Sequence, residues 1–218
     1  MLHVHQPEAA EARSLSEQAY YRLRELIVTI ELAPGSVISE PELMIRLGLG
    51  RTPIREALRN LQREKLIEVY PRRGMFVSAI NVGDLAALSE TRGTLESYAS
   101  GLAAERATAE DREDIDALLA ELGAVHGDGR RLIDLDQRIH RLVWACAHNP
   151  FLAATLEEYY IKTLRIWFLA LDRVADLGDS VGEHRELLSS IRAGDAARAS
   201  EAARRHVAGF ETAVRAAL

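Results

Sequence analysis

Length, composition and charge limit what this chain can be. It has 218 residues, 48% of them hydrophobic, and a formal net charge of −6, which suits one large or two small domains with an ample apolar core. Its one cysteine, Cys146, excludes an internal disulfide and favours a reducing compartment. No apolar run is long enough to cross a bilayer, and the N-terminus lacks the apolar core of a signal peptide. We therefore expect a cytoplasmic protein with no membrane partner.

Charge is distributed unevenly along the chain. Residues 1–80 carry 11 Lys and Arg against 10 Asp and Glu, a net charge of +1. Residues 81–218 carry 16 against 23, a net charge of −7. The difference suggests that the two parts meet different partners, although ordinary surface variation accounts for it equally well.

The chain is expected to open with an arm and a helix. Residues 1–13 are polar and predict a flexible N-terminal arm. Ser14 and Glu17 form an S-x-x-E capping box, and apolar residues recur behind it at helical spacing. The pair Pro34-Gly35 ends this helix.

Two more helices and a hairpin follow. Ser39 and Glu42 form a second capping box before a short helix. Thr52 is a good N-cap and Pro53 suits the first helical position, so a third helix is expected to begin there. After it, IEVY and MFVSAI predict two strands around the turn PRRG. Three helices and a hairpin make a winged helix-turn-helix domain, which we assign to residues 14–80.

Beyond residue 80 the strand signals almost vanish. Ala, Leu, Arg and Glu dominate, and Gly194-Asp195 reads as a glycine that ends one helix and an aspartate that caps the next. We expect a mainly α protein in which residues 81–218 form an all-α bundle of six to seven helices. The expected helices are 83–106, 109–124, 129–147, 150–173, 181–193 and 196–217, with breaks that include residues 126–129, 149–150 and 178–180.

The third helix and the hairpin turn concentrate positive charge. Arginines recur every fourth residue on the helix face opposite its leucines, and two more lie in the turn. A helix with a basic outer face fits the major groove of B-DNA, and residues near its start reach base edges. Arg59 and Arg63 could instead pair with acids of their own helix, which we favour for Arg63. The six arginines are Arg51, Arg55, Arg59, Arg63, Arg72 and Arg73.

A metal-ligand pattern lies in the second half of the chain. Asp136 and His140 are four residues apart and so share one helix face. His184 and His206 follow on two later predicted helices. Three imidazoles and a carboxylate complete most of a first-row metal shell. The spacing alone does not separate this site from histidines buried in an ordinary core, because D-x-x-x-H often arises by accident.

The motif RTPIREAL, residues 51–58, lies within a longer matching segment, LAPGSVISEPELMIRLGLGRTPIREALRNLQREKLIEVYPRRGMFV. This segment resembles the DNA-binding domain of GntR-family transcription regulators. The resemblance implies that the start of the third helix meets the operator and that the wing enters the minor groove or lies on the DNA backbone. Together with the charge pattern, it gives the expected DNA-binding residues Arg51, Thr52, Arg55, Arg72, Arg73 and Gly74.

Two positions depart from the GntR pattern. Gly50 stands where the family usually has Ser or Thr, so a hydroxyl that would bind phosphate is absent. Lys65 replaces a glycine at the end of the third helix, where a left-handed backbone conformation is common. We expect the first departure to weaken or retune contact with the operator, and the second to cost a little stability and to add a positive charge near DNA.

The helical half resembles the FCD ligand-binding domain of FadR-like GntR regulators. Asp136, His140, His184 and His206 match the order of that domain's metal ligands, and Glu90-x-Arg92 with Leu95-Glu96 matches its first helix. The resemblance implies a divalent metal ion, zinc first, with nickel or manganese as alternatives. This ion would help to hold a small carboxylate effector.

Two further residues are expected near the effector. Arg92 is a natural second contact for its carboxylate, although pairing with Glu96 four residues on explains the arginine equally well. Asn149 could contact the effector or could cap the helix that begins at Pro150, and we favour the cap.

These features predict a one-component transcription regulator rather than an enzyme. A homodimer would place two recognition helices on a palindromic operator, and repression relieved by a carboxylate effector is the commoner family behaviour. The alternatives are a metal sensor without an organic effector, or a metal-dependent hydrolase acting through Asp136 and the histidines. A fatty-acyl-CoA sensor is disfavoured because such relatives generally lack the full metal set.

Overall fold

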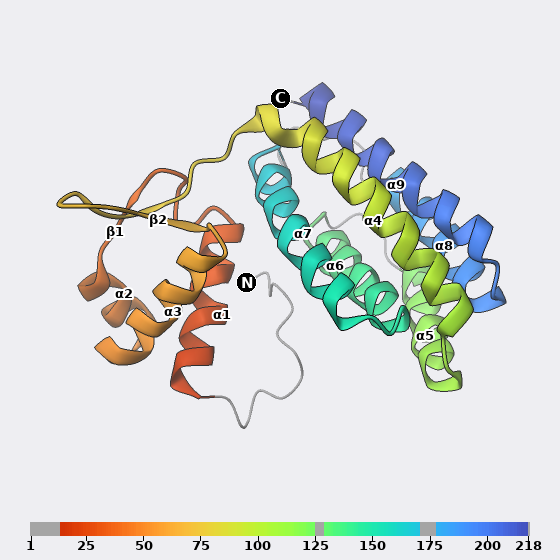
Figure 1. The fold of residues 1–218 in the computed structure, drawn as a ribbon, viewed down its shortest axis with the longest axis horizontal. Coiled ribbons are helices and arrows are strands. Elements are labelled where there is room, and N and C mark those ends of the chain that lie inside the picture. The colour runs from red at the N-terminus through yellow and green to blue at the C-terminus, as the bar shows by residue number, and fades with distance from the viewer. Residues whose placement is uncertain (1–13, 125–128, 171–177, 218) are drawn as a thin grey trace. The chain divides into compact units, whose positions relative to one another are not determined.

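The computed structural model describes residues 14–124, 129–170 and 178–217, and the chain divides into two compact units, Met1–Asn81 and Val82–Leu218. In the described part of the first unit, helices α1 to α3 accompany a small sheet, and the second unit is a group of long helices (Figure 1). The predicted arm, residues 1–13, lies outside the described residues. The protein is mainly α, as predicted, and no described helix is both long and apolar enough to cross a membrane.

The first unit is a winged helix-turn-helix. Apolar side chains from its helices, among them Leu23, Ile27, Ile54 and Leu61, are buried together. The β2–β3 hairpin pairs antiparallel, and β1 adds to β3 to give the sheet order β1-β3-β2. The first strand was not predicted, because two residues are too few to show an alternating pattern. The elements are α1 (Leu15–Val28), β1 (Val37–Ile38), α2 (Glu40–Leu47), α3 (Arg51–Arg63), β2 (Ile67–Tyr70) and β3 (Gly74–Val77).

Two predicted helix ends in this unit need correction. Helix α1 ends at Val28, well before the pair Pro34-Gly35 that was expected to end it, because Ile30 adopts a left-handed backbone with φ of 64°. Both halves of the capping box between Ser14 and Glu17 form. The prediction that Thr52 caps α3 is wrong, because the helix already begins at Arg51 and its N-cap is Gly50, which offers no side-chain hydrogen bond. Pro53 still fits, since N–H groups of the first turn have no partner inside the helix. Lys65 has φ of 60°, the left-handed conformation expected where relatives have glycine.

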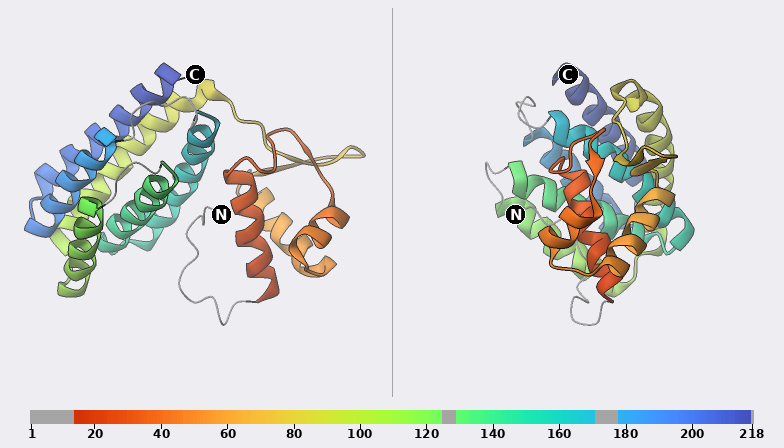
Figure 2. Two further views of the ribbon diagram at one scale, coloured as in Figure 1. Left: turned by 180° about the vertical axis from the view of Figure 1, so that it is seen from behind. Right: turned by 90° about the vertical axis from the view of Figure 1, so that its left-hand side faces the viewer.

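The second unit is a bundle of helices. Figures 1 and 2 show α4 running alongside α9, with α6 and α7 against another side of α4. The close approach of α4 and α9 favours a glycine, because a Cβ atom at Gly101 would lie 2.7 Å from Ser200 Oγ and would displace its hydrogen bond to Ser97 O. The elements are a 3₁₀ turn η1 (Val82–Asp84), α4 (Leu85–Arg106), α5 (Ala109–Ala124), α6 (Gly129–Cys146), α7 (Pro150–Ala170), α8 (Gly178–Ala193) and α9 (Ala196–Ala217).

Most of the predicted breaks agree with these bounds. Gly194 has φ of 77°, and Asp195 Oδ1 accepts a hydrogen bond from Arg198 N, so this predicted helix end and cap are confirmed. The break predicted at residues 178–180 is wrong, since these residues form the first turn of α8. Polar and small residues are common in a first helical turn, where they are hard to distinguish from a loop. Residues 126–128 and 171–173 of the predicted elements lie outside the described part.

Candidate metal centre and DNA-binding surface

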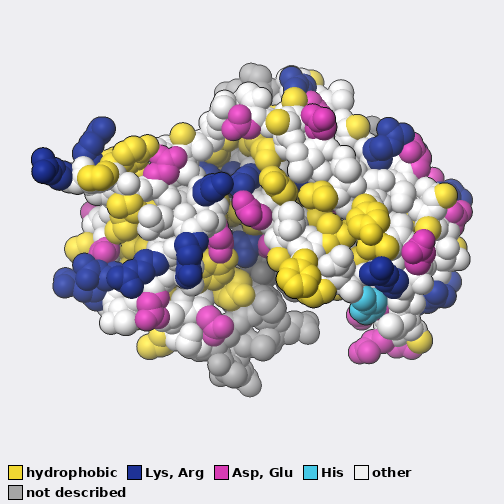
Figure 3. Space-filling view, viewed as in Figure 1, with side chains coloured by type: hydrophobic (Ala, Val, Ile, Leu, Met, Phe, Trp, Pro, Cys, Tyr) yellow, Lys and Arg dark blue, Asp and Glu magenta, His cyan; other side chains and the backbone are white. Residues whose placement is uncertain are grey.

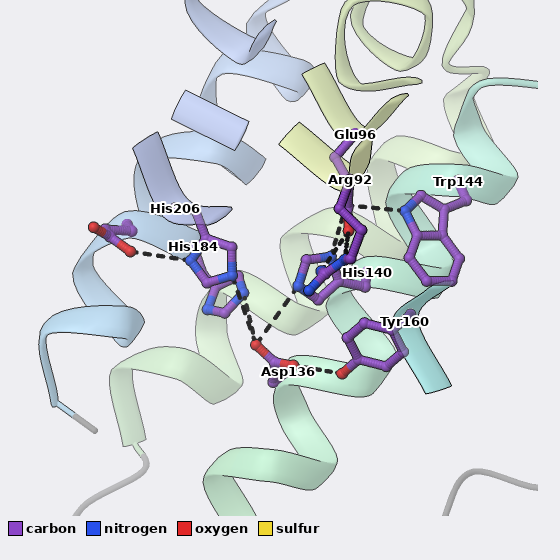
Figure 4. A network of polar contacts seen from close by, with 9 residues as sticks. Arg92, Glu96, Asp136, His140, Trp144, Tyr160, His184 and His206 are labelled. Atoms are coloured by element: carbon purple, nitrogen blue, oxygen red, sulfur yellow. Dashed lines mark hydrogen bonds and ion pairs between the residues drawn. The ribbon is translucent and has the colours of Figure 1, made fainter. Parts of the chain in front are cut away.

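The structure brings the four predicted metal ligands together. Asp136 and His140 come from α6, His184 from α8 and His206 from α9, and all four are buried. Asp136 Oδ1 lies 3.7 Å from Nε2 of His140, 3.2 Å from Nε2 of His184 and 3.9 Å from Nε2 of His206. One ligand atom from each residue falls within 4.8 Å of every other. Figure 4 shows the three imidazoles converging on the carboxylate.

A second layer of carboxylates orients two of the imidazoles. Nδ1 of His140 lies 2.9 Å from Glu96 Oε2, and Nδ1 of His206 lies 3.0 Å from Glu183 Oε2. A carboxylate at Nδ1 keeps the proton there and leaves Nε2 as the free lone pair, which is the usual arrangement of a metal-binding histidine. On the other side, Tyr160 donates to Asp136 Oδ2 at 2.5 Å, so Oδ1 is the oxygen that faces the histidines.

The donor set fits a divalent metal ion. His184 Nε2 is buried and makes no well-directed hydrogen bond within the described structure, although Asp136 Oδ1 lies within reach in distance. A buried nitrogen without a hydrogen-bond partner costs free energy. A bound ion would explain this geometry, because His184 Nε2 and Asp136 Oδ1 would then both point toward the ion and not toward each other. Three imidazole nitrogens and one carboxylate oxygen suit zinc, nickel or manganese and leave coordination positions for a ligand.

The buried charges are set by their neighbours. Burial would raise the pKa of Asp136, but its contacts with His140, His184 and His206 together outweigh this effect and hold the pKa well below its usual range. Burial would lower the pKa of His140, whereas Glu96 and Asp136 raise it above its ordinary value. Burial and nearby His184 lower the pKa of His206 to about 4, so this imidazole is neutral at pH 7. Burial and the charge of Asp136 raise the pKa of Tyr160 well above its usual value, which keeps the phenol a donor.

The two predicted effector residues have defined partners. Arg92 is buried, bonds Glu96 Oε1 through Nε at 3.1 Å and Nη2 at 2.5 Å, and lies over the Tyr160 ring at 5.1 Å. It is therefore paired with Glu96, but inside the bundle rather than on its surface. Asn149 Oδ1 accepts a hydrogen bond from Leu152 N at 3.2 Å, so the favoured reading of this residue as the cap of α7 agrees with the structure.

Sequence reasoning missed several residues of this network. Trp144 Nε1 donates to Glu96 Oε2 at 3.1 Å, and Tyr160 and Glu183 hold Asp136 and His206. Trp144 lies one helical turn beyond His140, so the α6 pattern could have indicated it. Tyr160 carries no sequence signal, because its partner lies on a different helix.

A separate groove opens on the outside of the helical unit. It has a volume of about 510 Å³ and lies between α4 and α9. None of the four candidate metal ligands lines it, and neither Arg92 nor Asn149 does. It therefore offers no support for the effector position expected at the metal.

The predicted DNA-binding residues lie on the surface of the first unit. Arg51, Thr52 and Arg55 at the start of α3 are exposed, as is the wing tip. Arg72 has φ of 63° and Gly74 has φ of 101°, so the wing turn depends on left-handed backbone at both positions. In Figure 3, Lys and Arg side chains gather at the tip of the β2–β3 hairpin and beside α2 and α3.

The arginines of α3 differ in their partners. Arg55 Nε lies 2.8 Å from Glu40 Oε2, across from α3 to α2. Arg63 Nη2 bonds Asn60 Oδ1 on its own helix, so its partner is internal as predicted but is not an acid.

Comparison with known proteins agrees with this architecture. The family described as bacterial regulatory proteins, gntR family, matches residues 15–77, and the FCD domain matches residues 87–209, more than half of the chain. An uncharacterized HTH-type transcriptional regulator in an unstable DNA locus of Streptomyces ambofaciens is 30% identical over 210 residues, covering 89% of this chain and 83% of the relative. The galactonate operon transcriptional repressor of Escherichia coli is 29% identical over 206 residues, covering 83% and 88%.

Solved structures show the same fold. Escherichia coli McbR/YncC superposes with a TM-score of 0.77 at 24% identity, covering 92% of this chain and 94% of that one. A putative GntR regulator from Rhodococcus sp. RHA1 has a TM-score of 0.72 at 18% identity, covering 94% and 100%. The relatives are regulators, so the hydrolase alternative is not supported. The chain belongs to the GntR family of bacterial regulatory proteins, with an FCD domain as its helical unit, and is a helix-turn-helix transcription regulator rather than an enzyme.

Proposed function

We propose that this regulator is a repressor whose binding to operator DNA responds to a small carboxylate effector held at a divalent metal ion in the FCD domain. The observation that carries the proposal is the convergence of three imidazole Nε2 atoms, each within 3.9 Å of Asp136 Oδ1, in a buried site. The ion, with zinc the first candidate, would supply a Lewis-acidic contact for the effector carboxylate.

The chain's own residues prepare that site. Glu96 and Glu183 keep His140 and His206 in the tautomer that presents Nε2, and Tyr160 restricts Asp136 to one inward oxygen. Arg92 donates hydrogen bonds to Glu96 through Nε and Nη2, so its third nitrogen, Nη1, would donate to the effector carboxylate. A relative named as the repressor of the galactonate operon, and thus for a sugar acid, supports a carboxylate as the signal and a repressor as the role of the protein.

The DNA-binding unit would recognise a palindromic operator as part of a homodimer. Two copies of α3 would enter successive major grooves, with Arg51, Thr52 and Arg55 near the bases. Arg72, Arg73 and Gly74 of the wing would lie on the backbone or in the minor groove. The effector can shift this equilibrium only by as much as it binds the free and DNA-bound states differently.

A thermal-shift screen of the metal-loaded full chain against small carboxylic acids tests the proposal. A ligand present at about a hundred times its Kd stabilises the native state by roughly 2.7 kcal/mol, which is a readily measured shift. We expect the shift to disappear in His184→Ala and to persist in His148→Ala, whose imidazole lies on the surface. The acid that shifts the protein should also lower its affinity for operator DNA.

Other results would overturn parts of the proposal separately. If metal binds but no acid shifts the midpoint, the effector is wrong, and DNA affinity with and without metal then tests the metal-sensor alternative. If the purified chain binds no divalent metal above the level of a His184→Ala variant, the metal centre itself is wrong.

A further inference from the structure

Arg55 is held in an unusual way for an exposed arginine. Its Nε lies 3.0 Å from Oε1 and 2.8 Å from Oε2 of Glu40, so both carboxylate oxygens meet one guanidinium nitrogen. Glu40 is the first residue of α2, and its side chain is 20% exposed against 55% for Arg55. The carboxylate therefore lies under the arginine, and the outer part of the guanidinium stays accessible to solvent.

This pairing leaves the two terminal nitrogens of Arg55 available. Within the described part of the chain, neither of them has a hydrogen-bond partner, since both contacts of the side chain go through Nε. Two terminal N–H groups in one plane are what a bidentate contact with guanine O6 and N7 requires. An arginine clamped at Nε also loses less rotamer freedom when it makes that contact.

The other arginines on this face are not held in the same way. No carboxylate pairs with Arg51 or Arg59 among the residues that the structure describes. Flexible arginines suit phosphate, which carries no sequence information, whereas an ordered arginine suits a base edge. A carboxylate so near the DNA also weakens non-specific attraction to phosphate, which favours discrimination between sequences.

We propose that Glu40 is a positioning residue for base recognition, acting through Arg55 to select a guanine at one position of the operator. The inference rests on the proposed contact between α3 and operator DNA. Glu40 is an acidic side chain in a surface that would bind a polyanion, and its proposed role is in specificity rather than in affinity.

The first experiment uses the full-length protein and a library of random DNA duplexes. The wild type is used to enrich a preferred duplex, and Kd is then measured at fixed salt for that duplex, for each single base-pair change in it, and for an unrelated duplex. We expect Glu40→Ala to bind the preferred duplex about tenfold more weakly and to lose the preference for guanine at one base pair. Binding to the unrelated duplex should stay the same or strengthen.

A double-mutant cycle separates this role from a structural one. If Glu40 acts through Arg55, the change Glu40→Ala should have no further effect on the base preference in an Arg55→Ala background. Glu40→Gln keeps one acceptor for Nε and should retain part of the preference, which also covers a poorly folded alanine variant. Glu42→Ala removes the same charge from the same helical turn and should leave the base preference unchanged.

Three results would overturn the inference. An unchanged base preference in Glu40→Ala would show that Arg55 needs no support. An equal loss on the preferred and unrelated duplexes, or a loss that persists without Arg55, would show that Glu40 acts on the fold. Failure of the wild type to enrich any sequence would instead overturn the proposed operator contact, on which the inference rests.

Discussion

Replacement of Glu96 by glutamine tests whether the buried polar network is built as described. Glu96 accepts hydrogen bonds from Arg92 Nε and Nη2, His140 Nδ1 and Trp144 Nε1. Glutamine keeps the shape but replaces one accepting oxygen with a donor, so at least one side of the network faces donor against donor. The side chains of Arg92 and Glu96 are only 4% and 2% exposed, and solvent cannot compensate the arginine that loses its counter-charge.

The expected loss of stability in Glu96→Gln follows from this burial. Breaking a buried ion pair by removing one partner costs about 3–5 kcal/mol, which corresponds to a thermal midpoint roughly 10–17 °C lower for a unit of this size. Because Glu96 also orients His140, metal affinity should fall about 10- to 100-fold.

Urea unfolding followed by tryptophan fluorescence measures the effect. Both tryptophans of the chain, Trp144 and Trp167, lie in the helical unit, so the signal reports that unit. Glu90→Gln on the exposed face of the same helix is the control and should change stability by less than about 0.5 kcal/mol. If Glu96→Gln unfolds within about 1 kcal/mol of the wild type in metal-free buffer, the ion pair does not have the role assigned to it.

Two further predictions concern the DNA-binding unit and the lone thiol. Gly50→Ser should stabilise the first unit by about 0.5–1 kcal/mol in thermal unfolding, because Gly50 has an ordinary backbone, leaves α3 uncapped and has room for a side chain. The matched change Gly48→Ser should destabilise it, since Gly48 has φ of 66°, and equal effects of the two would contradict the capping argument. Burial raises the pKa of Cys146 to about 12, so Ellman's reagent at pH 8 should label native protein at least about a hundredfold more slowly than urea-unfolded protein. Rapid labelling of the native thiol would show that this part of α6 opens readily.

The helices of this protein were accessible from sequence because their signals are local. Capping residues such as Ser14 and Asp195 and glycines such as Gly194 act on the turn next to them, so bounds could be predicted within a few residues. The errors arose where the same residue types serve two purposes. Thr52 was predicted to be an N-cap, but it lies in the first turn of α3. Residues 178–180 were predicted to be a break, but they form the first turn of α8. Capping residues and loop residues are both tolerated in a first helical turn, because its N–H groups have no partner inside the helix.

The candidate metal ligands could be named in advance, although their convergence could not be derived. Helical spacing relates Asp136 to His140, because both lie on α6. Nothing in that spacing relates them to His184 or His206, which come from helices that pack against α4 and against each other. The resemblance to FCD domains supplied that connection before the structure did.

By itself, then, the sequence determined the helices, the winged head and the basic face, since each depends on neighbours within a few positions, and it supplied the residue types of a candidate metal site. Only the tertiary structure decided which side chains support them. Tyr160 holds Asp136, Glu183 holds His206 and Glu40 holds Arg55 across different helices. Contacts between residues far apart in sequence depend on how whole helices pack, and no local periodicity encodes that packing.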